Sequence, residues 1–302
     1  MNSKTIKYII IILLLPVVPL KATAQTGIYY STNGQLSSSL INQLYQDQRG
    51  FIWISTEFGL NKFDGTHFTH YKHIDNDSTS LINNHVRGVF EDSYRNLWIR
   101  CLGGLMLYHP ETDDFELIKI EGKEGRHVTN IMELHNGEVW GITTGDTIFR
   151  INLTQKVIEP IDEINRKLHL KSFSSIYEDT RRNLWFISET QGLLCFNPKS
   201  EEIQHFKYPD VPDNNISAIK EDQNGNLFIG TLTKGLCLYD WEKKVFQPIP
   251  YENKQNLPIK HLAFTEGKLL IGTDGKGIKA YNPATHQIED YPVNAAPFNL
   301  GT

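Results

Sequence analysis

Three pairs of adjacent acidic residues are the first candidates for chemistry in this sequence: Glu91-Asp92, Glu178-Asp179 and Glu221-Asp222. Two carboxylates that flank a glycosidic bond are the groups a glycoside hydrolase needs. The pairs stand at the same place in different copies of an internal repeat, however. A catalytic pair should occur once, whereas a turn device should recur. We therefore interpret these acids as turn residues, with aspartates that cap their own turns.

Other reactive residues show no spacing that indicates catalysis or metal binding. The 11 histidines form no H-E-x-x-H pattern, and His85 and His127 occupy equivalent repeat positions. The three cysteines, Cys101, Cys195 and Cys237, form no C-x-x-C pair, and their odd number does not indicate a disulfide framework. We interpret them as small buried hydrophobic residues. The sequence therefore predicts no catalytic residues, no metal site and no cofactor.

One strand-like segment recurs six times at intervals of 42–45 residues. Its copies are centred on Trp53, Trp98, Trp140, Trp185, Phe228 and Leu270. Each copy lies in a unit of four strand candidates, which we call A to D: A ends in the acidic turn, B is the recurring segment, and a glycine turn leads to C. Four short strands in this period are typical of one propeller blade. We therefore predict an all-β fold, a β-propeller with six complete four-stranded blades.

The outer strand D is the most variable of the four. Its predicted copies are Phe68–Tyr71, Phe115–Ile118, Ile203–Tyr208, Val245–Ile249 and Ile288–Tyr291. We expect the tryptophan of strand B and the aromatic residue of strand C to fill the space between neighbouring blades, because stacking buries faces that a single blade cannot bury.

Departures from the repeat are the better guide to ligand contacts. The position two after the central residue is small or aliphatic in five copies but is Arg100 in the second. A guanidinium is costly to bury unless it is paired. Arg100 therefore either forms a structural ion pair or lies exposed, or it faces the central funnel and binds carboxylate, sulfate or sugar hydroxyls.

The turns between strands B and C open at one end of the predicted ring and would form a polar rim. The rim candidates are Glu57, Phe58, Glu189, Lys234, Asp274 and Lys276. Each of them alone is also consistent with a solvated loop residue. Together with Arg100 they form the predicted ligand-binding site.

The N-terminus has the pattern of a secretory signal. Lys4 and Lys7 precede the apolar run Tyr8–Leu20, which is shorter than the ~20 residues of a membrane span, and Ala22-Thr23-Ala24 is a cleavage site. We predict a signal peptide over 1–24, a propeller over 25–302, and export of the protein. The net charge of −5 offers no basic excess for phosphates, so direct contact with nucleic acid is not expected.

The unit resembles the two-component regulator propeller repeat. The matching stretches are Asp47–Leu60 and Asp222–Thr231, and Leu36–Asn42 and Phe63–Phe68 resemble the same family. The resemblance covers residues 27 to 302 and implies the periplasmic sensor region of a hybrid two-component system. In that family two seven-bladed propellers precede a membrane helix and a histidine kinase. The resemblance also implies an oligosaccharide ligand, a homodimer formed through the full sensor, and membrane attachment only through a C-terminal segment absent here.

The strand count leaves one candidate over, at Gly27–Ser31. It would supply the outer strand of a seventh blade, whose other strands would follow Thr302. The tail Ala295–Thr302 resembles a linker to a next repeat. We therefore hypothesise a truncated seven-bladed propeller; a self-contained six-bladed ring is the alternative.

The resemblance thus implies a non-catalytic sensor domain that binds a carbohydrate breakdown product, with histidine kinase activity only in a full-length parent protein. Two alternatives belong to other classes. A secreted propeller enzyme, such as a polysaccharide lyase or a glycosidase, would need acids or a metal cluster that break the repeat symmetry. A protein-binding scaffold would need an apolar rim, whereas these turns are mostly polar.

Overall fold

The structure is a computed structural model that describes residues 30–33, 35–120, 127–188, 190–251, 257–265 and 267–291, all within one compact unit, Tyr30–Pro292. The predicted signal peptide 1–24, residues 27–29 of the extra strand, Glu189 and the tail 295–302 lie outside the described residues. Within the described ranges, no helix is long and apolar enough to cross a bilayer.

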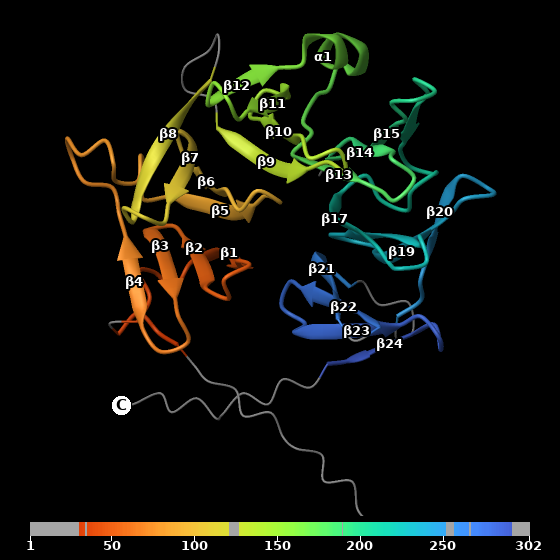
Figure 1. Ribbon diagram of the computed structural model, residues 1–302. Helices are drawn as coiled ribbons and strands as arrows, with labels where there is room; N and C mark the ends of the chain where they lie inside the picture. The colour runs from red at the N-terminus through yellow and green to blue at the C-terminus, as the bar shows by residue number, and fades with distance from the viewer. Residues whose placement is uncertain are drawn as a thin grey trace, which may run out of the picture. The chain divides into compact units, whose positions relative to one another are not determined.

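The described strands form six antiparallel four-stranded units, which we call blades 1 to 6 (Figure 1). Four of them are separate sheets, and blades 2 and 3 are joined in one eight-stranded sheet. In chain order, four to a blade, the strands are β1 (Ile41–Gln46), β2 (Ile52–Thr56), β3 (Gly59–Phe63), β4 (Phe68–Tyr71); β5 (Val86–Glu91), β6 (Leu97–Cys101), β7 (Gly104–His109), β8 (Asp114–Ile120); β9 (Val128–Glu133), β10 (Val139–Thr143), β11 (Ile148–Asn152), β12 (Val157–Pro160); β13 (Ser175–Glu178), β14 (Leu184–Ser188), β15 (Gly192–Phe196), β16 (Ile203–Phe206); β17 (Ile216–Glu221), β18 (Leu227–Thr231), β19 (Gly235–Asp240), β20 (Val245–Pro248); β21 (Ile259–Thr265), β22 (Lys268–Thr273), β23 (Ile278–Asn282) and β24 (Gln287–Asp290). Strands follow chain order within each blade, and β8 also pairs in parallel with β12. The prediction of six four-stranded blades is confirmed.

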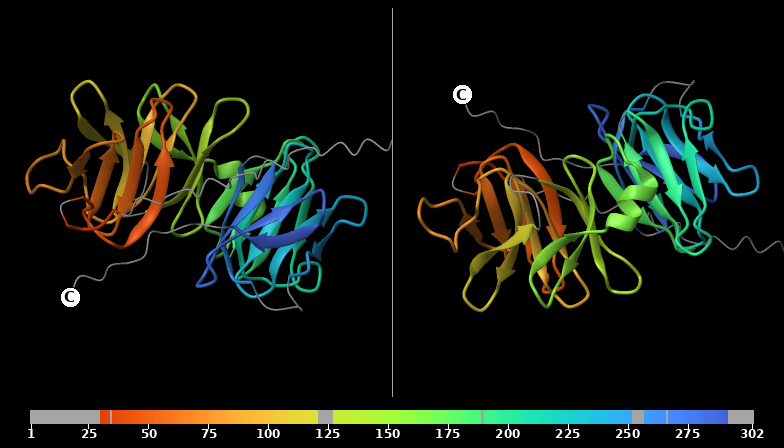
Figure 2. Two further views of the ribbon diagram at one scale, coloured as in Figure 1. Left: turned by 90° about the horizontal axis from the view of Figure 1, so that it is seen from below. Right: turned by 90° about the horizontal axis from the view of Figure 1, so that it is seen from above.

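The first strand of each blade is innermost, and neighbouring blades pack face to face (Figures 1 and 2). Five hydrophobic clusters join blade 1 to 2, 2 to 3, 3 to 4, 4 to 5 and 5 to 6. Between blades 4 and 5, Trp185 stacks on Phe206 with ring centres 5.6 Å apart and meets Tyr239 edge-on at 5.4 Å. The tryptophan and the strand C aromatic residue therefore fill the space between blades, as predicted.

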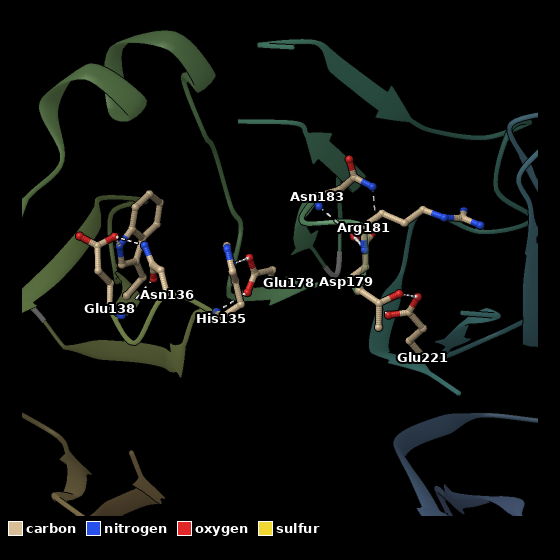
Figure 3. A network of polar contacts seen from close by, with 10 residues as sticks. His135, Asn136, Glu138, Glu178, Asp179, Arg181, Asn183 and Glu221 are labelled. Carbon is tan, nitrogen blue, oxygen red and sulfur yellow. Dashed lines mark hydrogen bonds and ion pairs between the residues drawn. The ribbon is translucent and has the colours of Figure 1, made fainter. Parts of the chain in front are cut away.

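The turn between strands A and B is built around its aspartate (Figure 3). Asp179 Oδ1 accepts hydrogen bonds from the backbone N–H groups of Arg181 (2.9 Å) and Asn183 (2.8 Å), while Oδ2 accepts from Trp185 Nε1 (2.7 Å). Asp47 and Asp92 hold Trp53 and Trp98 in the same way. One carboxylate thus closes the turn and fixes the ring that fills the next interface, which confirms the structural interpretation of these aspartates.

The glutamate before each aspartate has a different structural use, because it contacts the turn of the preceding blade (Figure 3). Glu221 Oε2 accepts from Thr180 N–H and Oε1 from the Thr180 hydroxyl, both at 2.7 Å. Glu91 and Glu178 likewise accept the backbone N–H groups of Gln48 (2.7 Å) and His135 (2.8 Å). The paired acids are therefore structural, but only the aspartates act within their own turn.

Several local features differ from the predictions. Strand β20 ends at Pro248 rather than Ile249, and β24 spans Gln287–Asp290 rather than Ile288–Tyr291. Helix α1 (Asp162–Leu168) lies in the connection between blades 3 and 4 and was not expected; its Leu168 is buried in the core that these blades share. Strand β16 ends at Phe206 rather than Tyr208, because the chain turns away there and Tyr208 is exposed. Strand β8 is longer than predicted at both ends, because Asp114 pairs with His109 of β7 and its last residues pair with β12.

Blade 1, the first of the series, has apolar side chains that are exposed. Leu40, Ile41 and Leu44, at the start of blade 1, are 60%, 45% and 63% exposed, and no cluster of described residues joins blade 6 to blade 1. Tyr30, which precedes blade 1, packs edge-on against Phe63 and Phe68 at 5.2 and 5.3 Å. The seventh blade stays a prediction.

Candidate functional site

The candidate site lies at the end of the blades that carries the B–C turns. In blade 2, Val86 at the start of β5 pairs with Cys101 at the end of β6, and Cys101 pairs with Gly104 across the B–C turn. The A–B turns with their aspartates lie at the other end of the same strands. The structural acids and the predicted ligand contacts are therefore separated by the length of a blade.

The predicted rim residues that the structure describes all lie in B–C turns. Two of them contact residues at the start of an inner strand. Glu57 Oε2 lies 2.8 Å from His85 Nδ1, and Asp274 Oδ2 forms an ion pair with Lys260 Nζ at 3.6 Å. Phe58, Lys234 and Lys276 are exposed. The rim is thus polar and partly neutralised.

Each of five inner strands carries a β-bulge at the same level, next to these turns. The bulged residues are Asn42, Arg87, Thr129, Ser217 and Lys260. A bulge adds one residue to a strand and re-aims its side chain. The repetition of the bulge places five side chains at corresponding positions of the innermost strands.

Four of the bulged residues have partners, and Arg87 differs. Asn42 Nδ2 donates to the Val86 carbonyl and Thr129 Oγ1 to the Ile142 carbonyl, both at 2.9 Å. Ser217 donates to the Ile259 carbonyl at 2.5 Å, and Lys260 pairs with Asp274. Arg87 Nε is buried and has no hydrogen-bond partner among the described residues. A buried guanidinium nitrogen without an acceptor is costly, so this position departs from its equivalents for a reason other than packing.

Arg100 lies beside Arg87, on the neighbouring strand β6. Its Nη1 donates to the Thr129 carbonyl of blade 3, and the guanidinium lies over Gly88. Burial lowers the pKa of Arg100 to about 10, and the charge of Arg87 adds to this lowering. Within the described part of the chain Arg100 has no carboxylate partner, so the structural ion pair that was its alternative role is not formed there.

Arg87 was missed because only the strand B positions were compared between repeats. The bulged position of strand A directly precedes the residue opposite Arg100 or its equivalents, and it carries asparagine, arginine, threonine, serine or lysine. The bulge itself follows from the register of the sheet and cannot be read from one strand. A pair of adjacent arginines, held by two inner strands, can bind an anionic group bidentately.

Two segments of the chain, residues 35–58 and 210–233, match the family model described as two component regulator propeller. The first contains β1, its acidic turn and β2, and the second contains β17, its turn and β18. A comparison with curated proteins finds no match.

Several solved structures share the fold. The extracellular domain assigned to hybrid two-component system BT3049 from B. thetaiotaomicron superposes with a TM-score of 0.75 at 24% identity, covering 88% of this chain and 37% of that chain. The corresponding domain of BT4673 from the same organism gives 0.70 at 20% identity, over 83% and 36%. Virginiamycin B lyase from Staphylococcus aureus gives 0.65 at 17% identity, over 87% of each chain.

The chain therefore spans little more than a third of the length of the two sensor domains, and about the same length as the lyase. At these identities the likeness concerns the fold, whereas the repeat itself is identified by the family model. The chain is accordingly a β-propeller that carries two-component regulator propeller repeats and shares its fold with the extracellular domains of hybrid two-component systems.

Proposed function

We propose that this propeller is the periplasmic ligand-sensing part of a two-component signalling receptor. It binds a carbohydrate breakdown product, an oligosaccharide, at the end that carries the B–C turns, and the signal passes to a histidine kinase of the full-length receptor. The observation that carries the proposal is the match of two segments to the two-component regulator propeller in a fold shared with extracellular sensor domains.

The chemistry of the B–C end supports a binding role. Its acids Glu57 and Asp274 are paired with His85 and Lys260, and the turns expose further polar side chains. The acids that recur at the other end accept hydrogen bonds within turns and between blades. Asp179 and Glu221 are examples. Sugar recognition requires polar groups fixed by a rigid scaffold, and this end of the blades supplies them.

A propeller enzyme is the second candidate, favoured by one observation: the lyase matches 87% of this chain with 87% of its own. Among the described residues, no group of three histidine, cysteine or acidic side chains lies close enough to share a metal ion. The two functions differ in what happens to the ligand. A sensor returns its oligosaccharide unchanged, whereas a lyase or a glycosidase releases shortened or unsaturated products.

Isothermal titration calorimetry of the chain against a panel of neutral and acidic oligosaccharides tests the proposal. We expect saturable binding of one structural class, and mass spectrometry of the recovered sugar should find it intact. Recovery of cleaved product would contradict the sensor function and support the enzyme function. Deletion of the encoding sequence should also abolish induction of a reporter by the bound sugar in the bacterium; induction that survives the deletion would contradict the signalling role.

A further inference from the structure

We propose that Arg87 and Arg100 form a binding site for an oxyanion, the carboxylate or sulfate group of an acidic sugar, at the B–C end of blade 2. The identity of the ligand as a sugar rests on the proposed function. The anion site itself rests only on the two arginines and on the residues that position them.

Arg100 and Gly88 depart from the repeat together. In each blade, the strand B residue at the position of Arg100 pairs with one strand A residue. From blade 1 to blade 6 these pairs are Gln43–Ser55, Gly88–Arg100, Asn130–Ile142, Ser175–Ile187, Ala218–Gly230 and His261–Gly272. Only blade 2 combines an absent side chain on strand A with a long cationic one on strand B. A Cβ atom at Gly88 would collide with the guanidinium of Arg100 and with Gln43 Oε1. Gly88 therefore provides the space in which Arg100 lies.

The surroundings fix this guanidinium rather than leaving it in solvent. Arg100 Nη1 donates to the Thr129 carbonyl, which belongs to the inner strand of the next blade. Gln43 Oε1, on the other side, accepts the Val89 N–H at 2.7 Å and is thereby held in place. The guanidinium is thus held against blade 3, and within the described residues it donates no other hydrogen bond.

The charge of the pair is not balanced by the described part of the protein. Other cations have partners there: Lys62 bonds to the Tyr108 hydroxyl at 2.9 Å, Arg150 pairs with Glu159 at 3.1 Å, and Arg181 stacks over Trp241 at 3.5 Å. Arg87 and Arg100 have each other as neighbours and no carboxylate in the described ranges, and Arg87 Nε is buried without an acceptor. Like charges withdrawn from water are unfavourable, and a bound anion removes that penalty.

Guanidinium chemistry defines the ligand class. Two adjacent guanidinium groups offer planar forks of N–H donors, which match the geometry of carboxylate and sulfate oxygens. The bulge positions of the two neighbouring blades carry an amide in Asn42 and a hydroxyl group in Thr129. Charged donors flanked by amides and hydroxyls suit an acidic sugar, whose anionic group would lie between the arginines.

A thermal unfolding experiment tests the anion site without any sugar. Sodium sulfate is compared with sodium chloride at equal ionic strength, for the wild type and for the double variant Arg87→Gln/Arg100→Gln. An ion bound only by the folded state raises the melting temperature. We expect a sulfate-dependent increase in the wild type that the double variant lacks. Arg49→Gln, which removes an exposed charge at the A–B end, should keep the increase.

Calorimetry then compares three related sugars: digalacturonic acid, galactobiose 6-sulfate and neutral galactobiose. We expect one of the acidic sugars to bind more tightly than galactobiose, which identifies carboxylate or sulfate as the preferred group. Each single variant, Arg87→Gln or Arg100→Gln, should weaken that binding by about 10- to 100-fold, since hydrogen bonds to charged groups contribute about 1.5–3 kcal/mol. Gly88→Val should have a similar effect because it displaces Arg100.

The outcomes separate the two proposals. Sugars that bind equally well to the wild type and to the arginine variants would overturn the anion site and leave the sensor intact. A sulfate effect that depends on the arginines, with no sugar bound, would support the anion site and contradict the carbohydrate ligand. An equal sulfate effect in the wild type and the double variant would reject the site, because it would come from the general action of the salt.

Discussion

At the scale of single residues, the aspartate of the A–B turn combines two duties. Asp179 closes its turn through backbone N–H groups and also holds the indole of Trp185, which is fully buried between blades 4 and 5. Where the repeat lacks this aspartate, the tryptophan N–H bonds to a different acceptor. Blade 3 has Leu134 in place of the aspartate, and Trp140 there bonds to Glu138 at 3.2 Å instead.

Asp179→Ala should therefore lower the free energy of unfolding by about 3 kcal/mol or more, because it leaves the buried Trp185 N–H and two turn N–H groups without their acceptor. Urea unfolding followed by tryptophan fluorescence measures the change. Asp64→Ala is the matched control, since Asp64 makes the same kind of turn contacts to Thr66 and His67 at an exposed site. Equal effects of both substitutions would show that the indole contact contributes nothing.

The cysteines give a second prediction at this scale. Burial raises the pKa of the Cys101 and Cys237 thiols to about 12 from the ordinary 9.0. Both should resist iodoacetamide in the folded protein at mildly alkaline pH, and all three cysteines should react after unfolding. Because the unfolded thiols lose their protons first, stability should fall as pH rises between about 9 and 12. Labelling of folded Cys101, read by mass spectrometry, would contradict this.

At the scale of elements, the glutamate that ends strand A links two blades. Glu221 holds both the backbone and the hydroxyl of Thr180 in the preceding turn. Blade 1 has Gln46 at the corresponding position. Among the described residues its side chain bonds only within its own turn, to the Gly50 carbonyl at 3.4 Å. The linking acid is thus present in blades 2 to 5, whereas blade 1 has an amide and blade 6 has Phe264 at the corresponding position.

Glu221→Ala should destabilise the protein by about 1.5–3 kcal/mol, the usual contribution of hydrogen bonds to a charged group. Gln46→Ala should change the stability by less than about 0.5 kcal/mol, as for an ordinary surface substitution. Urea midpoints of the two variants give the comparison directly. A loss of stability in Gln46→Ala equal to that in Glu221→Ala would mean that Gln46 also links blade 1 to another element.

The elements also show what could be read from the sequence. The strands repeat a pattern, so their number and order were predictable, and strands β2, β6, β14 and β18 lie where the recurring segment indicated. Helix α1 occurs once, in a connection, where comparison between repeats has nothing to compare. Its acidic first turn and basic last turn were nevertheless present as a helix signal.

The site was less predictable than the fold. Arg100 was identified because its position is small or aliphatic in the other blades. Its partner Arg87 lies on a different strand, and the two become neighbours only through the register that pairs Gly88 with Arg100. The role of Gly88 likewise depends on the position of the guanidinium across the strand pair. Such contacts depend on how the strands pair, so they can be identified only once the register of the sheet is known.

At the scale of the whole molecule, stability is distributed along a series of interfaces. Each of the five hydrophobic clusters belongs to one pair of neighbouring blades. In such a repeat array, stability approximates a sum of the units and their nearest-neighbour interfaces. A defect in one interface should therefore loosen the two blades that share it more than the others.

Phe206→Ala tests this, because Phe206 packs against Trp185, Tyr239 and Phe246 in the cluster shared by blades 4 and 5. Loss of a buried aromatic side chain costs about 3–5 kcal/mol. Hydrogen exchange should accelerate in β13–β20 and stay unchanged in β1–β8. Phe115→Ala, in the cluster shared by blades 1 and 2, should give the reverse distribution. Uniform acceleration in both variants would mean that the propeller unfolds as one cooperative unit, and that a ligand at blade 2 stabilises every blade equally.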